Sequence, residues 1–325
     1  MKIIFVLYII FILTFKVLAQ DDYVVSENDV RFDIEMGFSI FLDQSINQKL
    51  LPNQCFVETK NSKCQKFYSE LFLKDEISVN LAFGFENTNL KDDFAKDKIR
   101  KNLVIEKLTS KCDLQSNSNK ICDFQRTDDE DVLVKQLRLE NGTSKKMTIN
   151  LKSPMKFKSM SEVYANIDEQ NKESEKIKDF FENSIESADI AFYLGHSRIG
   201  GGPDFFPPVT DSSGHVNYEY YKTNQGGIDS LLEKLKNRKS RNLKVLGIFS
   251  CDSDKHFASK ISKIAPELNL ITTKRVINHV EGLLGALSSL NSILNGYCQN
   301  GIINQMNYNS IKDKSQKPFN FKDGV

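Results

Sequence analysis

The sequence has no tryptophan, only four histidines and seven prolines, and no marked excess of either charge. Its 44 basic and 43 acidic residues give a formal net charge of +1, so it lacks the strongly basic character that nucleic acids and anionic membranes attract. After the first 20 residues, no stretch is apolar enough to cross a bilayer. We therefore expect no nucleic-acid partner, and any imidazole chemistry must depend on very few positions.

The first 20 residues have the pattern of an export signal. Lys2 gives the positive start, residues 3–15 are nearly all apolar, and Val17-Leu-Ala19 places small residues where a signal peptidase cleaves. A membrane anchor is the alternative, but the apolar run is short and Lys16 interrupts it. We expect residues 1–20 to be removed and the mature protein to be secreted or periplasmic, without stable membrane insertion.

Six cysteines suit an exported chain, in which disulfides persist. Cys55 and Cys64 are close in sequence, and Cys112 and Cys122 flank a polar loop. The simplest pairing therefore has two local disulfides, Cys55–Cys64 and Cys112–Cys122. Two further cysteines remain, and their pairing bears directly on the chemistry considered below.

Residues 21–152 are predicted to form a β-rich, sandwich-like domain that contains these disulfides. Runs of alternating apolar and polar residues, typical of half-buried antiparallel strands, begin at Val30, Ile77, Leu133 and Met147. Asn141-Gly142 lies between the last two runs and is a hairpin turn signal; Asn141 also begins a glycosylation sequon. No catalytic pattern is visible in this region, so a role in binding, positioning or inhibition is left open.

Residues 153–298 have a pattern typical of an α/β domain, followed by a polar tail over residues 299–325 that we expect to be loosely packed. The short apolar runs Ile190–Leu194 and Leu243–Ser250 are bounded by glycine and polar residues, as buried strands are. Residues 227–235 between them have helical spacing, so this βαβ unit should contain parallel strands. Amphipathic segments before and after it predict helices on both faces of a parallel sheet.

His196 and Cys251 each follow one of these strands, so both are expected at the carboxyl edge of the sheet, where open α/β sheets bind ligands. The N-terminus of a following helix favours a thiolate at Cys251, and a nearby imidazole can act as general base and acid. The pair predicts a Cys/His dyad for acyl transfer. In the alternative, Cys251 forms a disulfide with Cys298 and the protein only binds a ligand.

The order of strand, Gly195-His196, βα crossover, strand, Ser250-Cys251 and helix resembles the caspase–gingipain–legumain group of cysteine peptidases over about residues 160–295. The resemblance implies a caspase-like fold and a protein or peptide substrate. It also implies that His196 is the general base, that Cys251 is the nucleophile, and that the backbone N–H groups of Ser197 and Cys251 form an oxyanion hole. Two features depart from the pattern: Ser197 replaces the usual glycine, and the Gln-Ala-Cys-x-Gly sequence of caspases is absent.

The glycine-rich loop after His196 is the predicted substrate-binding segment, with Arg198, Gly201, Gly202 and Asp204 as its candidate residues. Arg198 can bind a carboxylate through two parallel hydrogen bonds, and Asp204 can orient His196 or recognise a basic group. Both side chains also suit a structural salt bridge. The glycines allow a close backbone approach, but no Gly-Lys-Ser/Thr follows them, so a phosphate-binding loop is not indicated.

A metal-dependent hydrolase is the weakest alternative. Asp252, Asp254 and His256 lie beside the cysteine, and His196 and His215 lie upstream; such side chains bind several divalent ions. On a helix, however, the first three would point to different faces, and an aspartate there is explained by N-capping. We expect neither a metal nor a cofactor.

Overall fold

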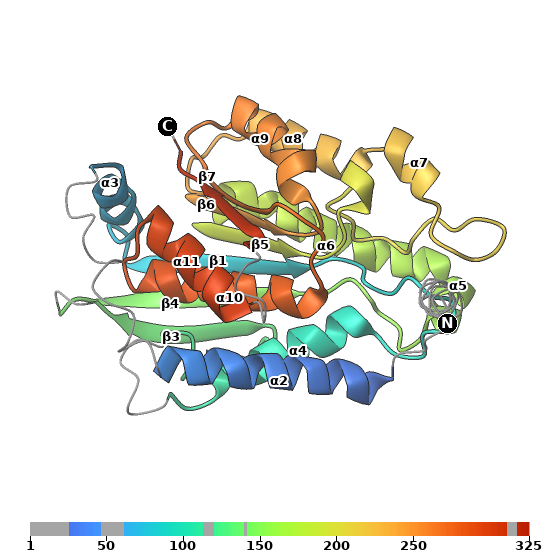
Figure 1. The fold of residues 1–325 in the computed structure, drawn as a ribbon, viewed down its shortest axis with the longest axis horizontal. Helices are drawn as coiled ribbons and strands as arrows, with labels where there is room; N and C mark the ends of the chain where they lie inside the picture. Colours follow the sequence, from blue (N-terminus) through green and yellow to red (C-terminus); the bar gives the residue numbers. More distant parts are fainter. Residues whose placement is uncertain (1–25, 47–61, 113–119, 140–141, 311–316, 325) are drawn as a thin grey trace, which may run out of the picture.

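A single sheet contains all eight strands of the described residues (Figure 1). The computed structural model describes residues 26–46, 62–112, 120–139, 142–310 and 317–324. In sheet order the strands are β2 (Gln125–Arg126), β3 (Val132–Arg138), β4 (Ser144–Lys152), β1 (Glu76–Phe83), β5 (Ile190–Leu194), β6 (Val245–Phe249), β7 (Asn269–Thr273) and β8 (Phe319–Lys322). The central strands, from β4 to β7 in this order, are parallel. The outer strands β2, β3 and β8 pair antiparallel with their inner neighbours.

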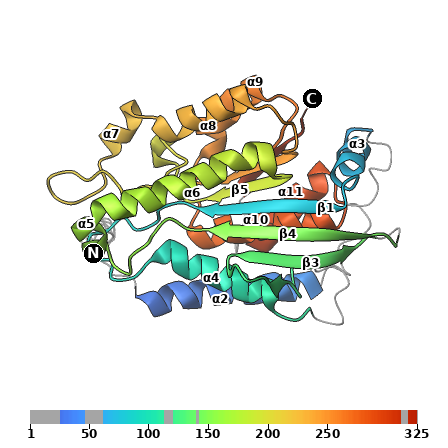
Figure 2. The same cartoon turned by 180° about the vertical axis from the view of Figure 1, so that it is seen from behind.

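Helices cover both faces of the sheet, and side-chain alternation decides which layer each strand residue meets. In β5, Ile190, Phe192 and Leu194 pack into one core, whereas Ala191 and Tyr193 pack into the other. The first layer contains α2 (Glu27–Ile46), α4 (Lys96–Thr109), α10 (His279–Leu294) and α11 (Gln299–Ser310). The second layer, nearer the viewer in Figure 2, contains α6 (Ile167–Ser187), α8 (Gly226–Asn237) and α9 (Ser259–Ile264). Helices on both faces of a mostly parallel sheet agree with the predicted α/β class.

Shorter helical elements lie in the segments that connect the main strands and helices. They are α3 (Ser62–Leu71), α5 (Met160–Ala165), η3 (Arg198–Gly200), α7 (Tyr218–Thr223) and η4 (Asp254–Ala258), of which η4 is a π-helical turn that runs directly into α9. None of the described helices is long and apolar enough to pass through a membrane.

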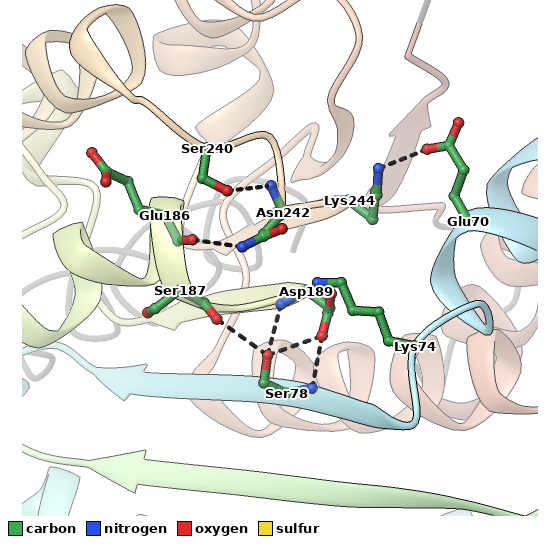
Figure 3. A network of polar contacts seen from close by, with 9 residues as sticks. All are labelled: Glu70, Lys74, Ser78, Glu186, Ser187, Asp189, Ser240, Asn242 and Lys244. Carbon is green, nitrogen blue, oxygen red and sulfur yellow. Dashed lines mark hydrogen bonds and ion pairs between the residues drawn. The ribbon is translucent and has the colours of Figure 1, made fainter.

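A polar clamp joins the strands at the amino edge of the sheet (Figure 3). The buried Asp189 carboxylate, just before β5, accepts hydrogen bonds from the N–H (2.9 Å) and the hydroxyl (3.0 Å) of Ser78 in β1. Lys74 pairs with the same carboxylate at 2.6 Å. The Asp189 carbonyl accepts a hydrogen bond from the N–H of Lys244, just before β6, at 2.8 Å. The clamp fixes where three parallel strands begin, and it lies at the edge opposite to the predicted site.

The strands expected in a separate N-terminal β domain belong to the same sheet as the rest. β1 and β4, both from residues 21–152, are parallel to each other, and β1 also pairs with β5. The described residues contain no second sheet, so the predicted sandwich is not seen, and Val30 lies in α2 instead of a strand. The alternation of apolar and polar residues predicted the half-buried face of β4 correctly. Such alternation does not indicate whether a strand runs parallel or antiparallel to its neighbour.

The antiparallel pairing of β3 with β4 agrees with the predicted hairpin. Asn141 itself, and with it the predicted glycosylation sequon, lies outside the described residues, as does the predicted signal peptide, residues 1–20.

The polar tail expected over residues 299–325 contains two ordered elements, so that prediction was wrong. α11 packs against α10, and β8 adds an edge strand whose Phe319 and Phe321 are buried. The strand is only four residues long, which leaves too little alternation for a sequence pattern to reveal it.

The disulfides differ in part from the expected pairing. Cys64 is bonded to Cys298, 234 residues away, which replaces the predicted Cys55–Cys64 bond; Cys55 lies outside the described residues. The structure contains the Cys112–Cys122 disulfide that the local spacing predicts. Because Cys298 is already bonded, the alternative Cys251–Cys298 disulfide is excluded, and Cys251 is a free thiol.

Candidate functional site

His196 and Cys251 leave the sheet at the same level of two neighbouring parallel strands. Leu194, the last residue of β5, pairs in register with Phe249, the last residue of β6. Each predicted site residue follows its strand by two positions, so the topology brings both to one edge. Both line the same small cavity, of about 50 Å³.

The hydrogen bond of His196 defines which ring nitrogen is free. Its Nε2 lies 3.2 Å from the backbone carbonyl oxygen of Glu86, in the loop after β1. A carbonyl oxygen can only accept, so Nε2 carries the proton and donates it. Burial, followed by the charges of Arg198, Arg100 and Lys96, lowers the pKa of His196 well below 6.5. His196 is therefore a neutral imidazole whose Nδ1 has a free lone pair.

Cys251 is a half-buried thiol whose Sγ donates to the Ile277 carbonyl oxygen at 3.4 Å. Burial raises its pKa above the usual value, and the negative charges of Asp252 and Glu281 act in the same direction. The expected thiolate is thus not the resting form, because burial and the two neighbouring carboxylates favour the neutral thiol. Thiol and imidazole are thus both neutral in the resting structure.

The residues after Cys251 predict an N-cap at Asp252 or Ser253, but no side-chain capping bond is present at Ser253. The Ser253 hydroxyl donates to the Ile248 carbonyl at 2.7 Å and accepts from the Thr273 N–H at 2.8 Å, so it ties β6 to β7. It makes no capping bond to the helix that follows.

The backbone is strained within three residues after each of the two predicted residues. Arg198 and Ile199 follow His196 with φ of 47° and 52°, and Asp252 follows Cys251 with φ of 50°. Among the described residues the only other non-glycine residue with positive φ is Asp123. L-residues, and β-branched isoleucine above all, avoid this left-handed region. Strain of this kind persists where the surrounding structure enforces it, typically at functional sites.

Three ionisable side chains that the sequence did not indicate also line the cavity: Glu86, Arg100 and His279. Glu86 and Arg100 form a buried ion pair, and His279 Nδ1 lies 3.4 Å from Glu86 Oε1. The His196 and His279 rings meet edge-on, with centroids 5.3 Å apart. His279 could have been found by the reasoning applied to His196. It also follows the carboxyl end of a parallel strand, β7, and such strand ends are where α/β sheets bind ligands.

The predicted substrate-binding pair, Arg198 and Asp204, is buried and internally paired. Arg198 Nε donates to Asp204 Oδ2 at 2.7 Å, and the guanidinium lies over the ring of Tyr221. Asp204 holds Arg198 rather than the imidazole of His196. The structural salt bridge considered as the alternative is therefore what the structure contains.

The loop glycines serve packing rather than an open binding surface. A Cβ on Gly202 would come within 2.6 Å of the His196 carbonyl oxygen, and one on Gly201 within 3.0 Å of the Asn224 carbonyl oxygen. The buried Tyr193 hydroxyl holds the same loop, because it donates to the His196 carbonyl at 2.9 Å and accepts from the Asp204 N–H at 2.9 Å. This loop positions His196, and its glycines are too enclosed to meet a substrate.

The two backbone groups predicted for the oxyanion hole differ in their placement. Neither the Ser197 N–H nor the Cys251 N–H donates to another residue in the described part of the chain. Cys251 lines the cavity, whereas Ser197 is buried beside it and accepts the N–H groups of Gly200 and Gly202 at its carbonyl. The Cys251 N–H is thus the better placed of the two candidates.

The side chains considered for a metal are dispersed. Asp254 accepts from Thr272 and Asn320, and His215 lies in an exposed turn bonded to Ser213. Across the described residues, no three His, Cys, Asp or Glu side chains are grouped so that they could hold a metal ion.

No protein-family model, curated protein or solved structure matches this chain.

Proposed function

We propose that this chain is an exported cysteine hydrolase of the peptidase type, with Cys251 as nucleophile and His196 as general base. One observation carries the proposal: a free thiol and a neutral imidazole with an unprotonated Nδ1 line one cavity at register-matched strand ends. This arrangement is also the one implied by the resemblance to the caspase–gingipain–legumain group, so we propose a caspase-like architecture around β1, β4, β5, β6 and β7 and a protein or peptide substrate.

The proposed reaction runs through a thioester. Sγ of Cys251 bonds to the carbonyl carbon of the scissile amide while the thiol proton passes to Nδ1 of His196. The Cys251 N–H supports the oxyanion. When the C–N bond breaks, the imidazolium gives this proton to the leaving amine. Water then attacks the thioester, loses a proton to His196, and the proton returns to sulfur. These steps use no cofactor.

Export is part of the proposal. The first 20 residues have the signal-peptide pattern, and two disulfides suit an oxidising compartment. We propose a secreted or periplasmic location.

Alkylation of Cys251 tests the dyad without knowledge of the substrate. The native, non-reduced protein from residue 21 is treated with iodoacetamide at pH 7.5, and the rate at Cys251 is measured by peptide mass spectrometry. In His196→Ala the thiol loses its base, so we expect the rate to fall roughly tenfold or more. Asp189→Ala is the control, because it weakens the clamp at the opposite edge and should leave the rate at the wild-type value.

One observation favours a second function, a ligand-binding protein with an inert thiol: burial raises the pKa of Cys251. Equal alkylation rates in wild type and His196→Ala would support that function and overturn the proposed dyad.

A further inference from the structure

Glu86 holds both imidazoles of the cavity. Its backbone carbonyl accepts from His196 Nε2 at 3.2 Å, and its carboxylate lies 3.4 Å from His279 Nδ1. The carboxylate is 2% exposed, and its other oxygen pairs with Arg100. Glu86 is therefore a fixed buried anion, and one residue sets the position of two histidines that are far apart in sequence.

His279 is placed to act on His196. It is the first residue of α10, directly after the Asn278 capping box, so its backbone is fixed. Its Nδ1 lies 3.4 Å from Oε1 of the Glu86 carboxylate, within the distance of an ion pair. The two rings meet edge-on with centroids 5.3 Å apart, and about a third of the His279 side chain is exposed. His279 also lines the cavity that contains Cys251.

The remaining charged neighbours of His196 oppose a positive charge on its ring. Arg198, Arg100 and Lys96 all lower its pKa. These cations are paired with Asp204, Glu86 and Asp92, respectively. Cys251 lines the same cavity as a thiol. The Glu86–His279 unit is thus the neighbour able to offset the charge that His196 gains when it takes a proton.

We propose that His279, backed by Glu86, is a positioning residue that holds the His196 ring and stabilises its imidazolium. In the step concerned, the S–H bond of Cys251 breaks, an N–H bond forms at His196 Nδ1, and a thiolate–imidazolium pair replaces two neutral groups. The buried Glu86 carboxylate attracts such a cation, and the His279 ring, in edge-on contact with His196, holds the ring that carries it. The inference rests on the proposed function, because it assigns His196 as the base.

The test is the pH profile of Cys251 alkylation by iodoacetamide between pH 5 and 9, measured on the full chain from residue 21. In His279→Ala the His196 imidazolium loses the ring that holds it in place, so we expect the rate at pH 7 to fall about fivefold and the profile to move to higher pH. His279→Asn retains an amide donor near Nδ1 for Glu86 but lacks the ring, so it should show the same fall. His215→Ala, in an exposed turn, is the matched control and should behave as wild type.

The outcomes separate the two proposals. A merely structural role, in which His279 only satisfies Glu86, predicts that His279→Asn recovers the wild-type profile; that result overturns the inference. If both His279 variants keep the wild-type profile while His196→Ala loses reactivity at Cys251, the role of His279 is overturned and the Cys251–His196 dyad is retained. If His196→Ala also keeps the wild-type profile, the proposed function itself fails. Thermal unfolding establishes that each variant is folded, and His279→Asn, which keeps a polar side chain beside Glu86, remains informative if His279→Ala is not.

Discussion

At the scale of single residues, the left-handed backbone at Ile199 allows the strain beside His196 to be measured. Its φ is 52° and its side chain is 40% exposed, so a glycine would relieve strain and lose little packing. We expect Ile199→Gly to raise the free energy of unfolding by about 0.5–1 kcal/mol, measured by urea denaturation. Val209 is similarly exposed but has no positive φ, so Val209→Gly should instead be destabilising. A loss of stability in Ile199→Gly would contradict the strain argument.

The lowered pKa of His196 makes a second prediction, about acid stability. In the unfolded chain this ring takes up a proton near pH 6.5, whereas burial keeps it neutral in the folded protein at that pH. The unfolded state therefore binds more protons below pH 6.5, and folding stability falls as the pH decreases. The contribution of this ring is at most about 1.4 kcal/mol per pH unit.

Comparison with His196→Ala isolates this contribution, because other groups titrate in both proteins. Between pH 6.5 and 5.5, wild type should lose about 1 kcal/mol more stability than the variant, measured by urea denaturation at each pH. His215→Ala is the control and should follow wild type. Parallel losses in wild type and His196→Ala would show that His196 is not held neutral by the fold.

At the scale of elements, the two disulfides connect very different stretches of chain. Cys64–Cys298 ties α3 to the segment between α10 and α11 across 234 residues, whereas Cys112–Cys122 spans 10. Loop-closure entropy predicts that removing the first bond costs about 5 kcal/mol and the second about 3 kcal/mol. Urea denaturation of the two Cys→Ser double variants measures both losses. A larger loss for Cys112–Cys122 would show that loop length does not govern these two bonds.

Strands β5 and β6 show which parts of the fold the sequence patterns could predict. β5 and β6 are short apolar runs ended by glycine or polar residues, and both were predictable because a strand covered on two faces must be apolar throughout. Their parallel order followed from the intervening helix. The Cys64–Cys298 bond was not predictable, because pairing depends on which distant helices pack together.

The site was likewise only half predictable. His196 and Cys251 follow recognisable strands, and strand ends have a known meaning in parallel sheets. The roles of Glu86 and His279 depend on where a loop after β1 and the start of α10 meet in space. Arg198 and Asp204 lie in a glycine-rich loop of the kind that binds ligands, which is why the sequence suggested a binding role. Their burial against each other, which only the structure shows, identifies them as a structural ion pair.

At the scale of the whole molecule, one sheet joins the regions that the sequence analysis divided at residue 152. β1 lies between β4 and β5, so separating residues 21–152 from the rest would expose a long edge of the central sheet and remove the α2–α4 side of one core. We expect residues 153–325 expressed alone to remain unfolded or to aggregate. The full chain should unfold in one cooperative transition, followed by circular dichroism. A folded 153–325 fragment with its own transition would contradict the single-unit account.

The most direct test of the proposed dyad is to trap the thioester on Cys251. The protein from residue 21 is mixed with a peptide library from a digested proteome, quenched in acid within seconds, and examined by intact mass and peptide mapping. We expect a peptide acyl adduct on Cys251 in wild type, its absence in Cys251→Ala, and a marked decrease in His196→Ala. Peptide cleavage that persists in Cys251→Ala, or the absence of both cleavage and adduct in wild type, would contradict the proposed dyad.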